Sequence, residues 1–86
     1  MSTAFSLAQL RQTLKNAIDH FSTVVKRDDK YAMGWFNLGK AQFANGNVGE
    51  AKKAYSQLRK LGSSNPKAND LANKLDRETG GAMARG

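Results

Sequence analysis

The sequence predicts an all-α protein made of antiparallel helical hairpins. Apolar residues recur at three- and four-residue steps along most of the 86-residue chain, which is the spacing of one face of an α-helix. Turn-forming residues interrupt this pattern at Asp28-Asp29, at Asn45 to Asn47 and at Ser63 to Pro66. Several apolar positions also recur at a fixed interval along the chain. We therefore expect about four helices, over residues 6–27, 30–45, 47–61 and 66–78.

The first helix begins with a capping box. The Ser6 hydroxyl and the Gln9 side chain are placed to satisfy each other's free backbone amides. From Leu7 to Val25 an apolar stripe continues without a break, and Lys26-Arg27 supply cations that suit the carboxyl end of a helix. The sequence therefore predicts one long helix rather than two short ones.

The middle of the chain predicts a helical hairpin. The second helix, residues 30–45, follows Asp28-Asp29, which we assign as its N-cap. Gly46 is expected to end it in a left-handed conformation. Asn47, followed three residues later by Glu50, forms a second capping pair and begins the third helix.

Two glycines within the second helix call for an explanation, because each weakens it by on the order of 1 kcal/mol relative to alanine. Gly39 has a packing reason: a small residue there, together with Ala51 in the third helix, lets two helix backbones approach closely. Trp35 and Tyr55 would fill the space on either side of that contact. For Gly34 the sequence offers no reason.

The fourth helix has clear signals at both ends. Gly62 closes the third helix, and Asn65 followed by Pro66 is an N-cap with a proline in the first turn. Gly80-Gly81 then ends the fourth helix. Its inner face consists of alanine and leucine at helical spacing, from Ala68 to Leu75.

The length of the chain allows one domain, with room for a single small core. We assign residues 1–80 to that domain and residues 81–86, which lack apolar periodicity, to a disordered tail. No apolar run approaches the length that spans a bilayer. The first eight residues contain no basic residue and no sustained apolar block, so no secretory signal is recognised and a cytoplasmic location is expected.

Charge and residue types limit the chemistry. Fourteen Lys and Arg residues against seven Asp and Glu give a net charge of +7, which favours acidic partners or nucleic acid. The basic residues are spread along the chain, as on solvated helix faces. There is no cysteine and His20 is the only histidine, so we predict no enzyme activity, no metal site and no cofactor.

An internal repeat leads to a family resemblance. Five residues of the first helix recur thirty-four positions later in the third, where Leu14, Ala17, Phe21, Val24 and Lys26 correspond to Val48, Ala51, Tyr55, Leu58 and Lys60. Trp35, Leu38-Gly39, Gly46, Ala51 and Tyr55 follow the signature of one repeat of the tetratricopeptide-repeat (TPR) family. The chain resembles that family over residues 32–65, preceded by the second helix of another repeat and followed by a capping helix.

The resemblance implies a short right-handed stack of helical hairpins, and it has three departures. Gln42 replaces the usual aromatic residue, with Phe43 beside it, and Pro66 comes three residues late. Gln12-Thr13 stand where a preceding hairpin would turn, so the first repeat lacks its first helix.

The resemblance also implies a protein-protein interaction module that binds a peptide or helix of a partner, expected to be acidic and apolar. Carried over to this chain, the groove residues are Met33, Phe36, Asn37, Lys40, Phe43 and Ala44. Asn37 and Lys40 would hold a carboxylate, although only part of such a clamp is present. For Phe36 and Phe43, packing against the first or fourth helix is an equal alternative.

Other functions remain open from the sequence. About three stacked repeats are usually needed for an autonomous fold, so this chain is expected to self-associate through Leu7, Leu10 and Leu14, unless the fourth helix gives cover enough. A related alternative is a small chaperone-like or structural subunit that folds together with its partner. Weak, non-specific nucleic-acid binding through the basic surface is a third.

Overall fold

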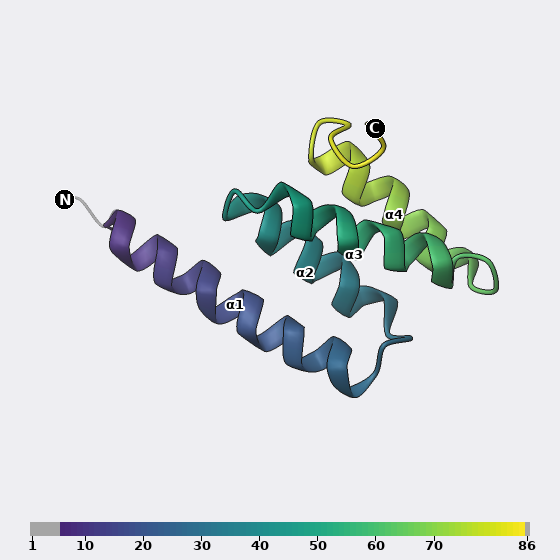
Figure 1. Ribbon diagram of the computed structural model, residues 1–86, viewed down its shortest axis with the longest axis horizontal. Helices are drawn as coiled ribbons and strands as arrows, with labels where there is room; N and C mark the ends of the chain where they lie inside the picture. Colours follow the sequence, from purple (N-terminus) through teal and green to yellow (C-terminus); the bar gives the residue numbers. More distant parts are fainter. Residues whose placement is uncertain (1–5, 86) are drawn as a thin grey trace.

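The computed structural model describes residues 6–85, and in this part of the chain it contains four helices and no strand (Figure 1). The helices are α1 (Leu7–Arg27), α2 (Ala32–Ala44), α3 (Val48–Leu61) and α4 (Pro66–Glu78). The predicted all-α class is confirmed. Helix α2 lies at the centre and contacts the other three, whereas α1 contacts α2 alone and extends past it at its amino end.

The helix boundaries repeat the interval seen in the sequence. Helix α2 begins at residue 32 and α4 at residue 66, and α2 ends at residue 44 and α4 at residue 78, so both ends differ by thirty-four residues. The carboxyl ends of α1 and α3, at residues 27 and 61, differ by the same number. The repeat therefore relates α2 to α4 as well as α1 to α3. This is the arrangement of a hairpin stack, in which equivalent helices occupy equivalent places.

Helix α1 is continuous over 21 residues, as predicted. The capping box is present, since the Ser6 amide donates to Gln9 Oε1 at 2.9 Å and the Gln9 amide donates to Ser6 Oγ at 3.2 Å. Lys26 and Arg27 occupy the last turn. Gln12 and Thr13, at the place where the hairpin turn is missing, are ordinary helical residues, and Thr13 Oγ1 donates to the Gln9 carbonyl.

The turn between α1 and α2 differs from the prediction. Asp28 is the C-cap of α1, and its carboxylate accepts the Lys30 amide at 3.1 Å. Because that carboxylate is used inside the turn, α2 begins only at Ala32, and its N-cap Tyr31 provides no side-chain hydrogen bond. The assignment of Asp28-Asp29 as the N-cap of this helix is therefore wrong. The Trp35 indole N–H donates to the Asp29 carbonyl at 2.8 Å and fixes the turn instead.

In the turn between α2 and α3, the prediction for Gly46 is confirmed and the predicted capping pair is absent. Gly46 has φ of 82°, the left-handed conformation that favours glycine. The expected Asn47–Glu50 capping pair is not formed: the Asn47 amide group donates to Gln42 Oε1 at 2.9 Å, and Glu50 pairs with Lys53 at 2.9 Å. The buried Gln42 side chain thus has a partner in the turn, which accounts for a polar residue where the family usually has an aromatic one.

The core lies between α2, α3 and α4. Its fully buried members come mainly from the facing sides of α3 and α4, namely Ala51, Leu58, Ala68, Ala72 and Leu75, with Phe36 from α2. A Cβ atom added at Gly39 would lie 2.7 Å from Leu75 Cδ2 and 3.4 Å from Ala54 Cβ. Gly39 is therefore small for a packing reason, as predicted, but its nearest neighbours are Leu75 and Ala54 rather than Ala51.

Gly34 packs against α1. A Cβ atom at this position would lie 3.1 Å from methyl groups of both Val24 and Val25. Val25 is the one buried residue of α1, with 5% of its surface exposed. A glycine in α2 thus allows α1 to approach closely, which answers the question that the sequence left open.

Helix α4 is joined to α3 by an arginine. The Arg59 guanidinium donates to the Tyr55 hydroxyl at 2.8 Å, to Asn69 Oδ1 at 3.1 Å and to Asn73 Oδ1 at 2.7 Å. At the start of α4, the Asn65 side chain accepts the Lys67 amide at 3.1 Å, so the predicted N-cap is confirmed.

The residues after α4 fold back on the domain. Gly80 and Gly81 both have positive φ and reverse the chain, as expected of the end of a helix. Met83 is then 4% exposed and belongs to the core cluster, and the Ala84 amide donates to Asp76 Oδ1 at 2.9 Å. Over residues 81–85 the structure therefore differs from the disordered tail expected from sequence, because Met83 supplies an apolar contact that periodicity does not reveal.

Candidate functional site

The six residues predicted for the groove occupy different environments on α2. Met33 is 42% exposed and Ala44 is exposed, whereas Asn37 and Phe43 are half-buried. Phe43 packs against the core cluster. Phe36 is only 4% exposed. Phe36 therefore packs in the core, which was the alternative prediction, and does not lie on a binding surface.

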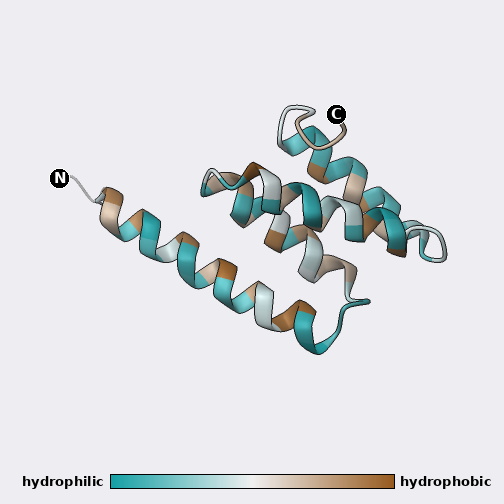
Figure 2. Cartoon of the chain, in the orientation of Figure 1, coloured by the Kyte–Doolittle hydropathy of each residue, from teal (hydrophilic) through white to brown (hydrophobic). Residues whose placement is uncertain are grey.

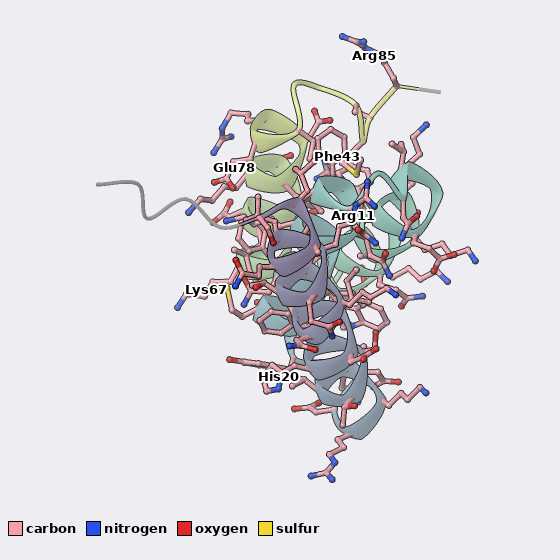
Figure 3. The ribbon with its side chains drawn as sticks, turned by 90° about the vertical axis from the view of Figure 1, so that its left-hand side faces the viewer. Arg11, His20, Phe43, Lys67, Glu78 and Arg85 are labelled. Atoms are coloured by element: carbon pink, nitrogen blue, oxygen red, sulfur yellow. The ribbon has the colours of Figure 1, made fainter. Side chains whose placement is uncertain are left out.

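Two lysines cover the Phe36 ring. Lys40 Nζ lies 5.3 Å from the ring centroid and Lys74 Nζ lies 5.6 Å from it, within the range of cation–π contacts. Both ammonium groups also approach the Glu78 carboxylate, Lys40 at 3.3 Å and Lys74 at 3.9 Å. Figure 3 shows Glu78 on the same side of the molecule as Lys67, which precedes it on α4. Lys40 therefore joins α2 to α4, and a ligand carboxylate would have to compete with Glu78 for it.

A cavity of about 440 Å³ lies at the amino-terminal ends of α2 and α4. The α1–α2 turn, the first turn of α2 and the first turns of α4 surround it. Its lining residues are Asp28, Lys30, Tyr31, Ala32, Met33, Asn65, Lys67 and Leu71. Of the predicted groove residues, only Met33 belongs to this cavity.

The walls of the cavity combine apolar surface with positive charge. Tyr31 is 49% exposed and Met33 is 42% exposed, and these are two of the large apolar side chains that the described residues leave open. Lys30 and Lys67 are exposed, and within residues 6–85 neither takes part in an ion pair. The one acidic residue of the lining, Asp28, accepts the Lys30 amide. The lining therefore places open apolar surface next to positive charge.

Sequence reasoning missed most of this cavity, although one signal was available. Carried from α2 to α4, the thirty-four-residue interval relates Met33 to Lys67 and Asn37 to Leu71. Extending the groove assignment along the repeat would have found both residues of α4. Tyr31 and Lys30 were not predictable in this way, because they lie in a turn whose conformation depends on the Trp35 hydrogen bond.

A second open surface lies on α1. Leu7 is 73% exposed, Leu10 is 47% exposed and Leu14 is half-buried. Figure 2 shows apolar positions recurring along α1 as far as its amino end, where no other helix of the described chain covers them. The exposure agrees with an interface at these leucines, and self-association through them stays a prediction.

The described residues contain no group of three or more His, Asp and Glu side chains placed to hold a metal ion. His20 is exposed, and its ring meets the edge of Phe21 with the ring centroids 5.0 Å apart. In this part of the chain, each helix is too short or too polar to cross a lipid bilayer.

Comparison with known proteins gives one partial relationship. No protein-family model matches the chain, and no solved structure matches it. A curated protein of Pseudomonas aeruginosa, described as TPR repeat-containing, is 40% identical to it over 43 residues. The match covers 50% of this chain and 41% of that protein, so the chain spans less than half the length of this relative. Together with the four-helix fold, the match supports the TPR resemblance for about half of the chain.

Proposed function

We propose that this chain is a protein-protein interaction module that binds an apolar-acidic segment of a partner in the cavity between the amino ends of α2 and α4. The observation that carries the proposal is the cavity itself, in which the open Tyr31 and Met33 side chains lie beside Lys30 and Lys67, two lysines without an ion pair among residues 6–85. The similarity to a TPR repeat-containing protein supports an interaction role for such a surface.

The proposed contacts follow from the chemistry of the lining. An apolar side chain of the partner would enter between Met33 and Leu71, where it displaces water from apolar surface. A carboxylate next to it would approach Lys30 or Lys67, which need not break an existing ion pair to bind it. Lys40, by contrast, is already paired with Glu78, so we place it at the margin of the site rather than at its centre.

The test is a titration of the chain with a short peptide in which a leucine is flanked by glutamates, followed by fluorescence anisotropy at about 150 mM salt. Lys67→Glu should weaken binding about tenfold, because an attraction becomes a repulsion. The matched control is Lys60→Glu, an equal charge change at an exposed position in the last turn of α3, outside the cavity. Equal weakening by both variants would show that only net charge matters, and would refute the site.

The same titration distinguishes nucleic-acid binding from peptide binding. A random single-stranded oligonucleotide should bind weakly at low salt and lose that binding steeply as salt rises. Peptide binding in the cavity should decline much less, since part of it is apolar. If the oligonucleotide instead competed with the peptide for the cavity at about 150 mM salt, the nucleic-acid alternative would replace the proposed function.

A second candidate is a structural subunit that folds together with a partner, and the open leucines of α1 favour it. It predicts a low free energy of unfolding for the isolated chain and a large increase on complex formation. Urea unfolding of the chain alone, compared with the chain in complex, measures both quantities.

A further inference from the structure

The amino-terminal third of α1 presents an apolar stripe that α2 is too short to cover. Helix α1 has 21 residues and α2 has 13, so at 1.5 Å per residue α1 is about 12 Å longer. The close contact of Gly34 with Val24 and Val25 places the beginning of α2 against the end of α1. The excess length therefore lies at the amino end of α1, beyond the end of α2 (Figure 1).

The exposed stripe continues the face that is buried against α2. Leu7 and Val25 are eighteen residues apart in number, which is five full helical turns, so they lie at the same angle around the helix. Val25 is 5% exposed and Leu7 is 73% exposed. One continuous face is thus closed at its carboxyl end, half-covered at Leu14 and open at Leu7 and Leu10.

Positive charge lines one edge of this stripe. Arg11 and Lys15 lie one turn apart on the same side of the leucines, and within residues 6–85 neither forms an ion pair. No acidic residue occurs in α1 before Asp19. The opposite flank carries no charged residue before the last turn, only side chains such as Thr13 and His20. Figure 3 shows Arg11 and His20 on opposite sides of α1.

This charge distribution argues against an antiparallel second copy of the chain as the occupant, and a parallel copy would collide with α2, which already covers the same face of α1 at its carboxyl end. Two α1 helices packed antiparallel through their leucines would place the same flank of each helix side by side. Arg11 and Lys15 of one copy would then meet Arg11 and Lys15 of the other, and like charges in contact oppose association. A helix with acidic residues along the matching edge meets the same surface with attraction.

We propose that Leu7, Leu10 and Leu14 form the docking face for an acidic amphipathic helix of a partner protein. This partner helix lies end to end with α2, against the same face of α1. Its apolar face covers the three leucines, and its Asp or Glu residues face Arg11 and Lys15. This surface lies beyond the carboxyl end of α2, whereas the cavity lies at the amino end. The two sites are independent, and either one stands if the other fails.

The probe is a side-chain-stapled helix of about four turns, with leucines at steps of three and four residues and glutamates along one edge. A second peptide carries lysines in place of the glutamates. Binding of each to the full chain is measured by fluorescence anisotropy at about 150 mM salt. We expect the glutamate peptide to bind at least ten times more tightly than the lysine peptide.

Matched variants locate the contact. Leu7→Ser with Leu10→Ser should abolish binding, and since both leucines are exposed the fold should persist, as circular dichroism will check. Arg11→Glu should weaken the glutamate peptide about tenfold and strengthen the lysine peptide. Lys26→Glu is the control, because it makes the same charge change on α1 about 22 Å further along the helix and should leave both peptides unchanged.

Three results would overturn the proposal. Binding that tolerates the Leu7 and Leu10 changes would place the peptide elsewhere. Equal binding of both peptides, or no binding of either at millimolar concentration, would refute an acidic helix as the partner. A concentration-dependent dimer in sedimentation, abolished by the same serine changes, would show that a second copy occupies the face, as the sequence predicted. None of these results affects binding in the cavity, so failure here is distinguishable from failure of the proposed function.

Discussion

The close approach of α4 to Gly39 makes a substitution there decisive for the packing of the stack. In an open helix, Gly→Ala stabilises by about 1 kcal/mol through reduced freedom of the unfolded chain and better helix propensity. At Gly39 the added Cβ would lie 2.7 Å from Leu75 Cδ2, a distance at which one of the two must move. Leu75 is fully buried, so moving its methyl group away disturbs the close packing of the core around it.

The magnitude follows from these opposing effects. Overpacking of a closed core typically costs about 1–3 kcal/mol, which exceeds the gain in helix propensity. We therefore expect Gly39→Ala to lower the free energy of unfolding by up to about 2 kcal/mol. For a domain of this size, such a loss lowers the melting temperature by several degrees. Gly49→Ala is the matched control, because a Cβ there meets no atom within 4 Å, and it should stabilise by up to about 1 kcal/mol.

Urea unfolding followed by far-ultraviolet circular dichroism gives both numbers. A double-mutant cycle with Leu75→Val adds a test of mechanism, since valine lacks the δ methyl group that would collide. Gly39→Ala should cost less in the Leu75→Val background than in the natural chain, with a coupling of at least about 0.5 kcal/mol. The reasoning would be refuted if Gly39→Ala stabilised the chain as much as Gly49→Ala does.

Three further predictions concern other contacts. Phe36→Ala should cost about 3–5 kcal/mol, as for a buried core aromatic, whereas Met33→Ala should cost well under about 1 kcal/mol; equal costs would show that Phe36 is not part of the core. Arg59→Ala should lose about 1–2 kcal/mol in urea unfolding, since its guanidinium bonds both α3 and α4. Lys60→Ala is its control and should be close to neutral. Ser6→Ala should lower the helical dichroism, and it should make amide exchange in the first turn of α1 about five times faster, which corresponds to a loss of about 1 kcal/mol. An unchanged exchange rate would count against the capping box.

The helices were predictable because their signals are local. The capping box at Ser6 and Gln9, the Asn65–Pro66 start of α4 and the left-handed Gly46 depend only on neighbouring residues, and all are confirmed. The thirty-four-residue interval was visible in the sequence and reappears in the helix boundaries. Local rules thus suffice for the elements and for their order.

What could not be predicted depends on contacts between elements. Asp28 and Asn47 have the right side chains to cap a helix, yet the Asp28 carboxylate accepts the Lys30 amide within its turn and the Asn47 side chain donates to Gln42 of α2. Gly34 became intelligible only through Val24 and Val25 of α1. For the candidate site, Phe36 shares its helix face with Met33, and only the position of α4 decides that the first is buried and the second open. A single helix cannot reveal this difference.

The sparse attachment of α1 has a consequence for how the molecule folds. Because α1 contacts α2 alone, and the other contacts join helices that are neighbours or next neighbours along the chain, little loop-closure entropy is lost when they form. Chains with such local contacts fold in microseconds to milliseconds. In a stack held by nearest-neighbour interfaces, an end unit also opens without the rest. We therefore expect the amides of α1 to exchange through a partial opening that leaves α2, α3 and α4 assembled.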